Sequence, residues 1–158
     1  MAEPLADQIV RKVKQTAELY HRLILVIALA GAGKTTALLD VRDRMGAPLV
    51  NVNLEISRRM LDLTERQRAL RLPRLLREIV DNGDDEMILL DNIEVMFDVG
   101  LKQDPLRLLQ GLSRNKTVVA AWNGSIVDGS LTYAAPAHPE YRRYPVRDFL
   151  VASPEVTT

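Results

Sequence analysis

Apolar and polar positions follow two different patterns along the chain, which predict helices and strands in turn. From Leu5 to Ala17 an apolar residue recurs every four positions, so we expect an amphipathic helix over residues 4–21. Residues 23–30, with the sequence LILVIALA, are instead apolar at every position and include β-branched side chains. A short run of this kind is typical of a strand that is buried on both faces of a sheet.

The same alternation continues to residue 123. Further helices are expected at 35–45, at 54–82 in several pieces and at 104–115, and further strands at 48–53, 87–92 and 117–123. Thr64 and Gln67 fit a capping box, and Pro73 is expected to start a new helix or to kink the old one. Buried-type strands that alternate with helices predict an α/β fold, in which helices flank a mostly parallel five-stranded sheet. Ligands of such sheets bind at the carboxyl ends of the strands.

The pattern changes after residue 123. The sequence NGSIVDGS at 123–130 has the composition of a loop, and residues 141–153 are expected to add a fifth strand or a terminal hairpin. We therefore expect a single domain over residues 1–158, with an N-terminal helix within 1–22 and a strand or hairpin tail over 124–158. After the last strand too few residues remain for a helical lid domain.

Composition excludes several kinds of site. The chain has no cysteine, which excludes disulfides and thiolate metal sites, and its two histidines argue against a histidine-built one. Lys and Arg number 21, as do Asp and Glu, so bulk charge favours neither nucleic acid nor an acidic membrane. The longest apolar run, 23–30, is far shorter than the roughly 20 residues that span a bilayer, and no signal peptide pattern is present. A cytoplasmic protein without membrane contact is the expectation.

The segment ALAGAGKTT, residues 28–36, follows the first buried strand and opens a helix, as a phosphate-binding loop (Walker A motif) does. The glycines let the backbone curl so that N–H groups point at phosphate oxygens, and the helix N-terminus adds its dipole. Lys34 is expected to neutralise the β- and γ-phosphates of ATP, and the Thr35 hydroxyl to bind Mg²⁺. Ala28 replaces the first glycine of the usual pattern, which alanine permits if its φ stays negative. The candidate nucleotide-binding residues are Ala28, Gly31, Ala32, Gly33, Lys34, Thr35 and Thr36.

A second candidate element is the strand MILLDN at 87–92. Its Asp91 stands where a phosphate-binding-loop protein places the carboxylate that completes the Mg²⁺ site. Asn92 follows where many ATPases have a glutamate that polarises the attacking water, and an amide orients water but takes no proton at neutral pH. Glu94 would supply a base if the chain bends back, or else it is a solvated glutamate of the next turn.

The strand TVVAAWN at 117–123 ends on Asn123, and we expect this strand to lie beside the one that carries Asp91. An amide at this point can contact the γ-phosphate or the attacking water and so sense hydrolysis. The alternative interpretation is a turn at Asn-Gly, which suits a β-hairpin.

Two groups of arginines remain. Four arginines of the region 58–77 are spaced by three and could share a helix face that grips DNA phosphates, although a solvated helix face is the commoner explanation. The arginines of this region are Arg58, Arg59, Arg66, Arg68, Arg71, Arg74 and Arg77. Arg142 and Arg143, in HPEYRRYP, are expected where the last strand rises toward the nucleotide. They are candidate arginine fingers, in cis or on a neighbouring subunit, or else surface residues of an edge strand.

Four motifs in this order, ALAGAGKTT, MILLDNIEVMF, VVAAWNG and HPEYRRYP, resemble the BrxF family. These are the small P-loop proteins of type 3 bacteriophage exclusion (BREX) systems. The first three motifs are shared with AAA+-like ATPases in general, whereas LLDNIE and HPEYRRYP point to BrxF. The resemblance covers essentially the whole chain. It implies a three-layer, AAA+-like P-loop fold and a role in bacterial phage defence, beside a DNA methyltransferase, a phosphatase-like protein and a larger ATPase.

Together these features predict a minimal ATP-binding domain that acts as a slow Mg²⁺-dependent ATPase or as an ATP switch. The candidate catalytic residues are Asn92, Glu94, Asn123, Arg142 and Arg143, and the candidate metal ligands are Thr35 and Asp91. Expected partners are nucleotide, other phage-defence proteins, a second copy of the chain and DNA through the 58–77 region. Two alternatives are a non-hydrolysing interaction module, which Asn92 favours, and a small-molecule kinase, whose arginine-rich lid residues 58–77 would mimic.

Overall fold

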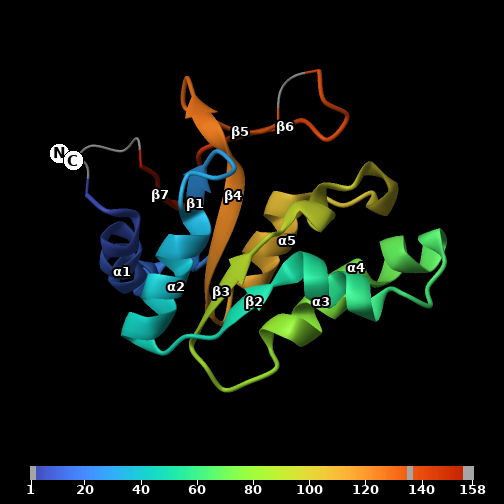
Figure 1. The fold of residues 1–158 in the computed structure, drawn as a ribbon, viewed down its shortest axis with the longest axis horizontal. Coiled ribbons are helices and arrows are strands. Elements are labelled where there is room, and N and C mark those ends of the chain that lie inside the picture. Colours follow the sequence, from blue (N-terminus) through green and yellow to red (C-terminus); the bar gives the residue numbers. More distant parts are fainter. Residues whose placement is uncertain (1–2, 135–136, 155–158) are drawn as a thin grey trace.

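In the computed structural model, helices pack on both faces of a mainly parallel β-sheet (Figure 1). The structure describes residues 3–134 and 137–154. The helices are α1 (Leu5–Gln15), α2 (Lys34–Met45), α3 (Val52–Arg59), α4 (Glu65–Val80) and α5 (Pro105–Leu112), with short 3₁₀ helices η1 (Thr16–Glu18), η2 (Glu94–Phe97) and η3 (Val99–Leu101). The strands are β1 (Leu23–Ala28), β2 (Leu49–Asn51), β3 (Met87–Asp91), β4 (Thr117–Val127), β5 (Ser130–Tyr133), β6 (Arg142–Pro145) and β7 (Leu150–Ala152). Within the described residues, no helix is both long and apolar enough to cross a membrane.

The five parallel strands have the order β2-β3-β4-β1-β7. Ala28 at the end of β1 pairs with Asn123 on β4, and Asn51 at the end of β2 pairs with Asp91 on β3. The predicted α/β arrangement is therefore confirmed, and so is the expectation that the strand with Asn123 neighbours the strand with Asp91. The carboxyl end of β3 and the Asn123 position of β4 meet at one edge of the sheet, which also carries the end of β1.

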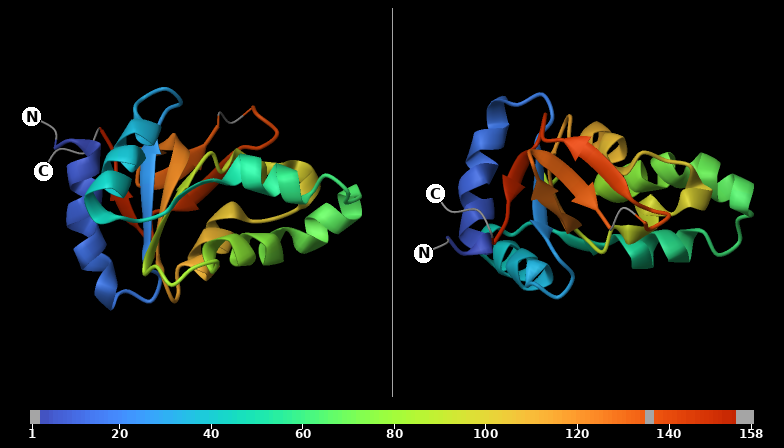
Figure 2. Two further views of the ribbon diagram at one scale, coloured as in Figure 1. Left: turned by 60° about the horizontal axis from the view of Figure 1, so that its bottom comes forward. Right: turned by 90° about the horizontal axis from the view of Figure 1, so that it is seen from above.

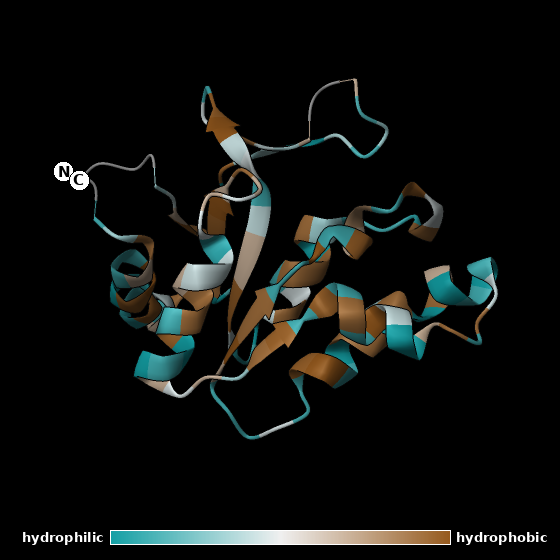
Figure 3. Ribbon diagram, in the orientation of Figure 1, coloured by the Kyte–Doolittle hydropathy of each residue, from teal (hydrophilic) through white to brown (hydrophobic). Residues whose placement is uncertain are grey.

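Two apolar layers hold the helices against the sheet. Leu23, Leu25 and Ile27 of β1 belong to a core shared with α3, α4 and α5, whereas Ile24 and Val26 belong to a core shared with α1 and α2. All of β1 is buried, because its side chains alternate between two covered faces. Figure 2 shows α1 and α2 on one side of the sheet and the other three helices on the opposite side. In Figure 3, β2 and β3 are hydrophobic except at their carboxyl ends, where they finish on Asn51 and Asp91, while the outer ends of α2 and α4 are hydrophilic.

Helix α4 continues through Pro73, so the expectation that a new helix starts there is wrong. Proline has no N–H, and the Ala69 carbonyl four residues earlier therefore loses its helical donor. The Gln103 side chain takes that place, since its Nε2 donates to the Ala69 oxygen at 2.8 Å. The predicted capping box at the start of α4 is confirmed, with reciprocal side-chain and backbone hydrogen bonds between Thr64 and Gln67.

Strand β4 is longer than predicted and includes part of the segment whose composition indicates a loop. Residues 124–127 continue the strand, and Asp128 and Gly129 turn the chain into β5 with φ angles of 50° and 74°. Two consecutive positive φ angles are the signature of the two-residue hairpin turn that Asp-Gly favours. The interpretation of Asn123-Gly124 as a turn is therefore wrong. Gly124 is required by close packing, because a Cβ there would collide with the Thr132 carbonyl of β5.

The region after β5 contains both of the expected alternatives. β7 is a fifth parallel strand beside β1, whereas β6 pairs antiparallel with β5 and extends the β4–β5 hairpin. Arg142 and Arg143 lie on β6, so the expectation that they lie on the last strand of the parallel sheet is wrong. Pro145 ends β6, and the chain turns through Asp148, with φ at 63°, before β7 begins. The expected tail also includes 135–136 and 155–158, which lie outside the described residues.

The end of β7 is joined to α1 by a buried side chain. Gln8 is 1% exposed, and its Nε2 donates to the Ser153 carbonyl at 2.9 Å. Its Oε1 accepts from the Ser153 N–H at 3.1 Å. The first helix and the last described strand therefore hold one another in place.

Candidate functional site

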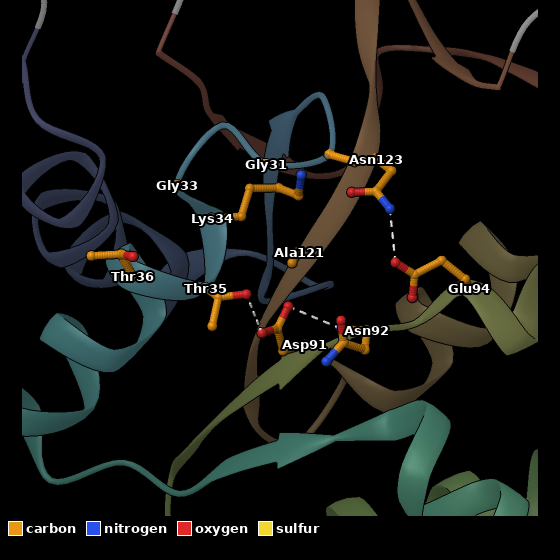
Figure 4. Close-up of a pocket in the computed structure, with 11 residues that line it drawn as sticks. Gly31, Gly33, Lys34, Thr35, Thr36, Asp91, Asn92, Glu94, Ala121 and Asn123 are labelled. Carbon is orange, nitrogen blue, oxygen red and sulfur yellow. Dashed lines mark hydrogen bonds between the residues drawn. The ribbon is translucent and has the colours of Figure 1, made fainter.

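A cavity of about 310 Å³ opens where β1, β3 and β4 meet the start of α2 (Figure 4). It brings together most of the residues that the sequence singles out. The lining residues are Ala30, Gly31, Gly33, Lys34, Thr35, Thr36, Asp91, Asn92, Glu94, Ala121 and Asn123. Ala28, Ala32, Arg142 and Arg143 are not among the described residues that line it.

The loop between β1 and α2 has the backbone that its glycines predict. Gly31 and Gly33 have φ angles of 81° and 94°, which strain any residue with a Cβ. Gly33 is also the N-cap of α2 and supplies no side-chain hydrogen bond to the free N–H groups of the first turn. Ala28 ends the preceding strand without a positive φ, so alanine is accommodated there. The start of α2 thus presents free donors and the positive end of the helix dipole to the cavity.

Lys34 is the buried cation of the site. The residue is 7% exposed, and its Nζ donates to the carbonyls of Ala28 at 3.0 Å and Leu29 at 2.8 Å. Burial lowers the pKa of the Lys34 ammonium, and the carboxylates of Asp91 and Glu94 partly offset this effect. Although Ala28 does not line the cavity, its carbonyl therefore helps to position the charge that does.

Thr35 and Asp91 form a polar contact between α2 and the end of β3. The Thr35 hydroxyl donates to Asp91 Oδ2 at 2.7 Å, and Asp91 Oδ1 accepts from the Asn92 N–H at 3.0 Å. Asp91 is 6% exposed, and these two hydrogen bonds hold its carboxylate in place. A hydroxyl and a carboxylate oxygen beside this cavity are suitable ligands for Mg²⁺, which prefers oxygen.

After Asp91 the chain reverses, and this brings Glu94 to the cavity. Asn92 has a left-handed φ of 52°, and its carbonyl accepts from the Asn53 N–H at 2.9 Å. The short helix η2 then starts at Glu94, whose carboxylate faces the cavity beside Asn123 (Figure 4). The sequence left open whether Glu94 faces the site or lies in solvent. The chain bends back, and Glu94 lines the cavity.

Two amide side chains hold the Glu94 carboxylate. Asn123 Nδ2 donates to Oε1 at 2.7 Å, and Asn53 Nδ2 donates to Oε2 at 3.2 Å. Asn53 also accepts from the Val95 N–H at 2.8 Å and so fixes the start of η2. The sequence-based reasoning missed Asn53. Its position two residues after the end of β2, at the same edge of the sheet, is the signal that could have identified it.

The arginine groups lie away from this cavity. Arg142 donates to the Gln103 carbonyl at 3.0 Å, which ties β6 to the segment before α5. A spacing of three residues turns each successive side chain by about 60° around a helix, so the four spaced arginines of α4 spread over half its circumference. Arg74 pairs with Glu78 and Arg77 with Asp81. The four arginines spaced by three therefore do not form one free cationic face.

Comparison with known proteins adds no family to this geometry. No protein-family model matches the chain, and no curated protein matches it either. The chemistry that the site permits is therefore judged from its own residues. They offer donors for an anion, two oxygen ligands for a divalent cation and one carboxylate that can accept a proton.

Proposed function

We propose that the protein binds ATP with Mg²⁺ at the β1–α2 loop and acts as a slow ATPase or an ATP switch. The observation that carries this proposal is the gathering of Lys34, the Thr35–Asp91 pair and Glu94 around one cavity at the start of α2. On this basis the fold is a P-loop fold of the AAA+-like kind. The strand order agrees, since β4 inserts Asn123 between the loop strand and the aspartate strand.

The binding chemistry follows from charge and free donors. The N–H groups of the loop and of the first turn of α2 would hold phosphate oxygens, and Lys34 would neutralise the β- and γ-phosphates. Thr35 and Asp91 would hold Mg²⁺, which shields phosphate charge during transfer. Thr36, the third residue of α2, would lie on the α-phosphate side.

Water activation is the second part of the proposal. Glu94 can accept a proton, whereas the Asn92 amide cannot, so we assign the general base role to Glu94. Asn123 donates to the same carboxylate, and this contact would change when a γ-phosphate competes for its amide. Such competition would let Asn123 sense whether the γ-phosphate is present.

The cellular role that we propose rests on the motif resemblance. The order of the four motifs, and LLDNIE and HPEYRRYP in particular, supports a BrxF-like component of a phage-defence complex. One observation favours a second candidate, a non-hydrolysing module that uses ATP as a structural ligand. Asn92 directly follows Asp91, and both oxygens of Glu94 already accept hydrogen bonds.

The experiment compares ATP binding and phosphate release in one preparation. Calorimetry with Mg-ATP and a phosphate-release assay, with and without DNA, separate hydrolysis from binding alone. Lys34→Ala should weaken ATP binding at least tenfold, about 1.4 kcal/mol, because it removes the charge aimed at the phosphates. Lys14→Ala, at an exposed lysine of α1, is the matched control. If Lys34→Ala binds ATP as tightly as the parent chain, the proposed nucleotide site is wrong.

A further inference from the structure

We propose that a second surface, distant from the ATP cavity, binds single-stranded nucleic acid. This α5 surface consists of Tyr20, His21, Arg107, Arg114 and Arg147. Tyr20 and His21 precede β1, and Arg114 precedes β4, so these three lie at the sheet edge opposite to the proposed ATP site. Both views of Figure 2 show the α1–β1 connection beside α5. The inference does not depend on the proposed ATPase activity.

Tyr20 provides an exposed aromatic ring that its neighbours hold in place. The residue is 66% exposed, although tyrosine in a folded protein usually buries much of its ring. The Arg114 guanidinium lies 4.9 Å from the centroid of the Tyr20 ring, and the His21 ring meets it edge-on at 4.8 Å. The guanidinium lies over one face of the exposed ring, and an unstacked base can stack on the other face.

The Tyr20 ring borders a hollow that adjoins a second hollow beside α5. His21 Nδ1 donates to the Gln110 carbonyl at 3.0 Å, which ties the α1–β1 connection to the helix. Gln110 lines a hollow of about 430 Å³ together with Arg107 and Arg147. Asp148 lines both this hollow and a second one, of about 390 Å³, that Tyr20 and His21 line. The two hollows therefore adjoin; one carries aromatic groups, and the other carries two arginines together with Asp104 and Asp148.

Asp104 and Asp148 share the larger hollow with Arg107 and Arg147, but no ion pair joins these side chains. Arg107, Arg114 and Arg147 are exposed, and none of them takes part in an ion pair within the described residues. In contrast, four arginines of α3 and α4 pair with Glu55, Glu78 or Asp81. Arg66, Arg68 and Arg71 of α4 also lack an ion pair within the described residues, so unpaired arginines alone do not distinguish the two regions. The 58–77 region has no aromatic residue, whereas the α5 surface combines unpaired arginines with an exposed ring.

The exposed ring selects the class of nucleic acid. Bases of a duplex are stacked on one another and present no free face, whereas single-stranded bases stack on aromatic side chains. An acidic peptide would pair with the arginines but would gain nothing from Tyr20. Single-stranded nucleic acid is the partner that uses both kinds of group.

Fluorescence anisotropy with labelled oligothymidylate and oligouridylate tests this proposal, with a DNA duplex and polyglutamate as competitors. Arg107→Ala/Arg114→Ala should weaken binding roughly tenfold or more and lower the log–log salt slope by about 1.4, or about 0.7 for each lost phosphate contact. Tyr20→Leu should weaken it roughly fivefold to a hundredfold, whereas Tyr20→Phe should leave it nearly unchanged.

The matched control is Arg66→Ala/Arg71→Ala, which removes the same charge from exposed positions of α4. This variant should bind the oligonucleotides as the parent chain does, and thermal unfolding verifies that all variants are folded. Equal loss in both double variants would overturn the proposal, because net charge alone would then explain binding. The proposal would also be overturned if the parent chain bound neither oligonucleotide, or if it bound duplex or polyglutamate more tightly. Unchanged binding by the Tyr20→Leu variant would overturn it as well.

Discussion

Asn92 determines where the side chains that follow Asp91 point. Its φ of 52° is a conformation that asparagine and aspartate adopt more readily than other non-glycine residues. The resulting reversal brings a carboxylate three positions after Asp91, that of Glu94, to the cavity. The spacing between the metal-ligand candidate and the base candidate is therefore a property of backbone geometry as well as of sequence.

Glu94→Gln should lower the rate of phosphate release roughly 10²–10⁴-fold, because glutamine keeps the side-chain shape but accepts no proton. ATP affinity should change little, since the loop, Lys34 and Asp91 are untouched. A phosphate-release assay and calorimetry on the same sample measure both quantities. Glu18→Gln, at an exposed glutamate, is the control.

Asn92→Asp distinguishes the two possible positions of the base. Aspartate tolerates the left-handed φ and installs a carboxylate without a change of shape, whereas glutamate would add strain of about 1 kcal/mol. We expect this variant to hydrolyse ATP no faster than the parent chain. A rate increase from Asn92→Asp, together with no loss from Glu94→Gln, would assign water activation to position 92.

Tyr133 predicts a pH dependence of stability. Burial, with a smaller effect of the Glu94 and Glu140 carboxylates, raises its pKa from 10.0 to about 12. The folded state therefore keeps a proton that the unfolded chain releases, and this contribution is full below pH 10 and is lost as pH rises toward 12. Tyr133→Phe should flatten the decline in unfolding free energy above pH 10 by up to about 1.4 kcal/mol per pH unit. Urea unfolding at several pH values tests this, with Tyr20→Phe as the control; equal slopes in all three chains would contradict it.

At the scale of elements, β4 differs from the other parallel strands because it leaves the sheet after Asn123 and continues into a hairpin. The indole of Trp122 donates to the Thr132 carbonyl at 3.0 Å, and Gly124 leaves room for that contact. Phe97, at the end of η2, stacks on Tyr133 of the hairpin with ring centroids 3.5 Å apart. The hairpin is therefore packed against the same short helix that begins at Glu94.

Gly124→Ala should destabilise the protein by about 1–3 kcal/mol, the usual range for overpacking, because the new methyl group would collide with β5. Chemical denaturation measures the change. Gly129→Asn is the matched control, since Gly129 has open space and asparagine tolerates its positive φ. Equal stability of Gly124→Ala and the parent chain would show that β5 does not approach β4 this closely at Gly124.

The elements that the sequence predicted well are those with strong local signals. All residues of β1 are apolar, the Thr64–Gln67 capping box starts α4, and Gly46 ends α2 with φ at 68°. The features it missed depend on residues far apart in the chain. Gln103 sustains α4 past Pro73, and β5 turns the segment after Asn123 into strand. Asn53 belongs to the site only because β2 ends beside β3.

At the scale of the whole molecule, the proposed ATP site has fewer cationic side chains than phosphoryl transfer commonly uses. Within the described residues Lys34 is the cation that lines the cavity, and phosphoryl transfer commonly uses a second one. Arg143 is exposed on β6 and available to another copy of the chain. A site completed between two subunits would explain both observations.

We therefore expect ATP to promote self-association. Mixing an Arg142→Ala/Arg143→Ala chain with a Lys34→Ala chain should then restore part of the ATPase activity, because each copy supplies what the other lacks. Light scattering with and without ATP measures assembly, and each variant alone is the control for activity. A monomer in the presence of ATP and no rescue on mixing would leave these arginines as surface residues.

The position of β7 has a consequence for how the protein is made. β1 lies between β4 and β7, and β7 is also the strand to which Gln8 holds α1. After β4 has been synthesised and before Leu150 has been added, β1 therefore has one unpaired edge, and the first helix lacks its buried partner. Unpaired strand edges are prone to bind other chains. The strand that leads into the proposed phosphate loop thus waits for the synthesis of β7, and a nascent chain acquires the parallel sheet described above only when this segment has emerged.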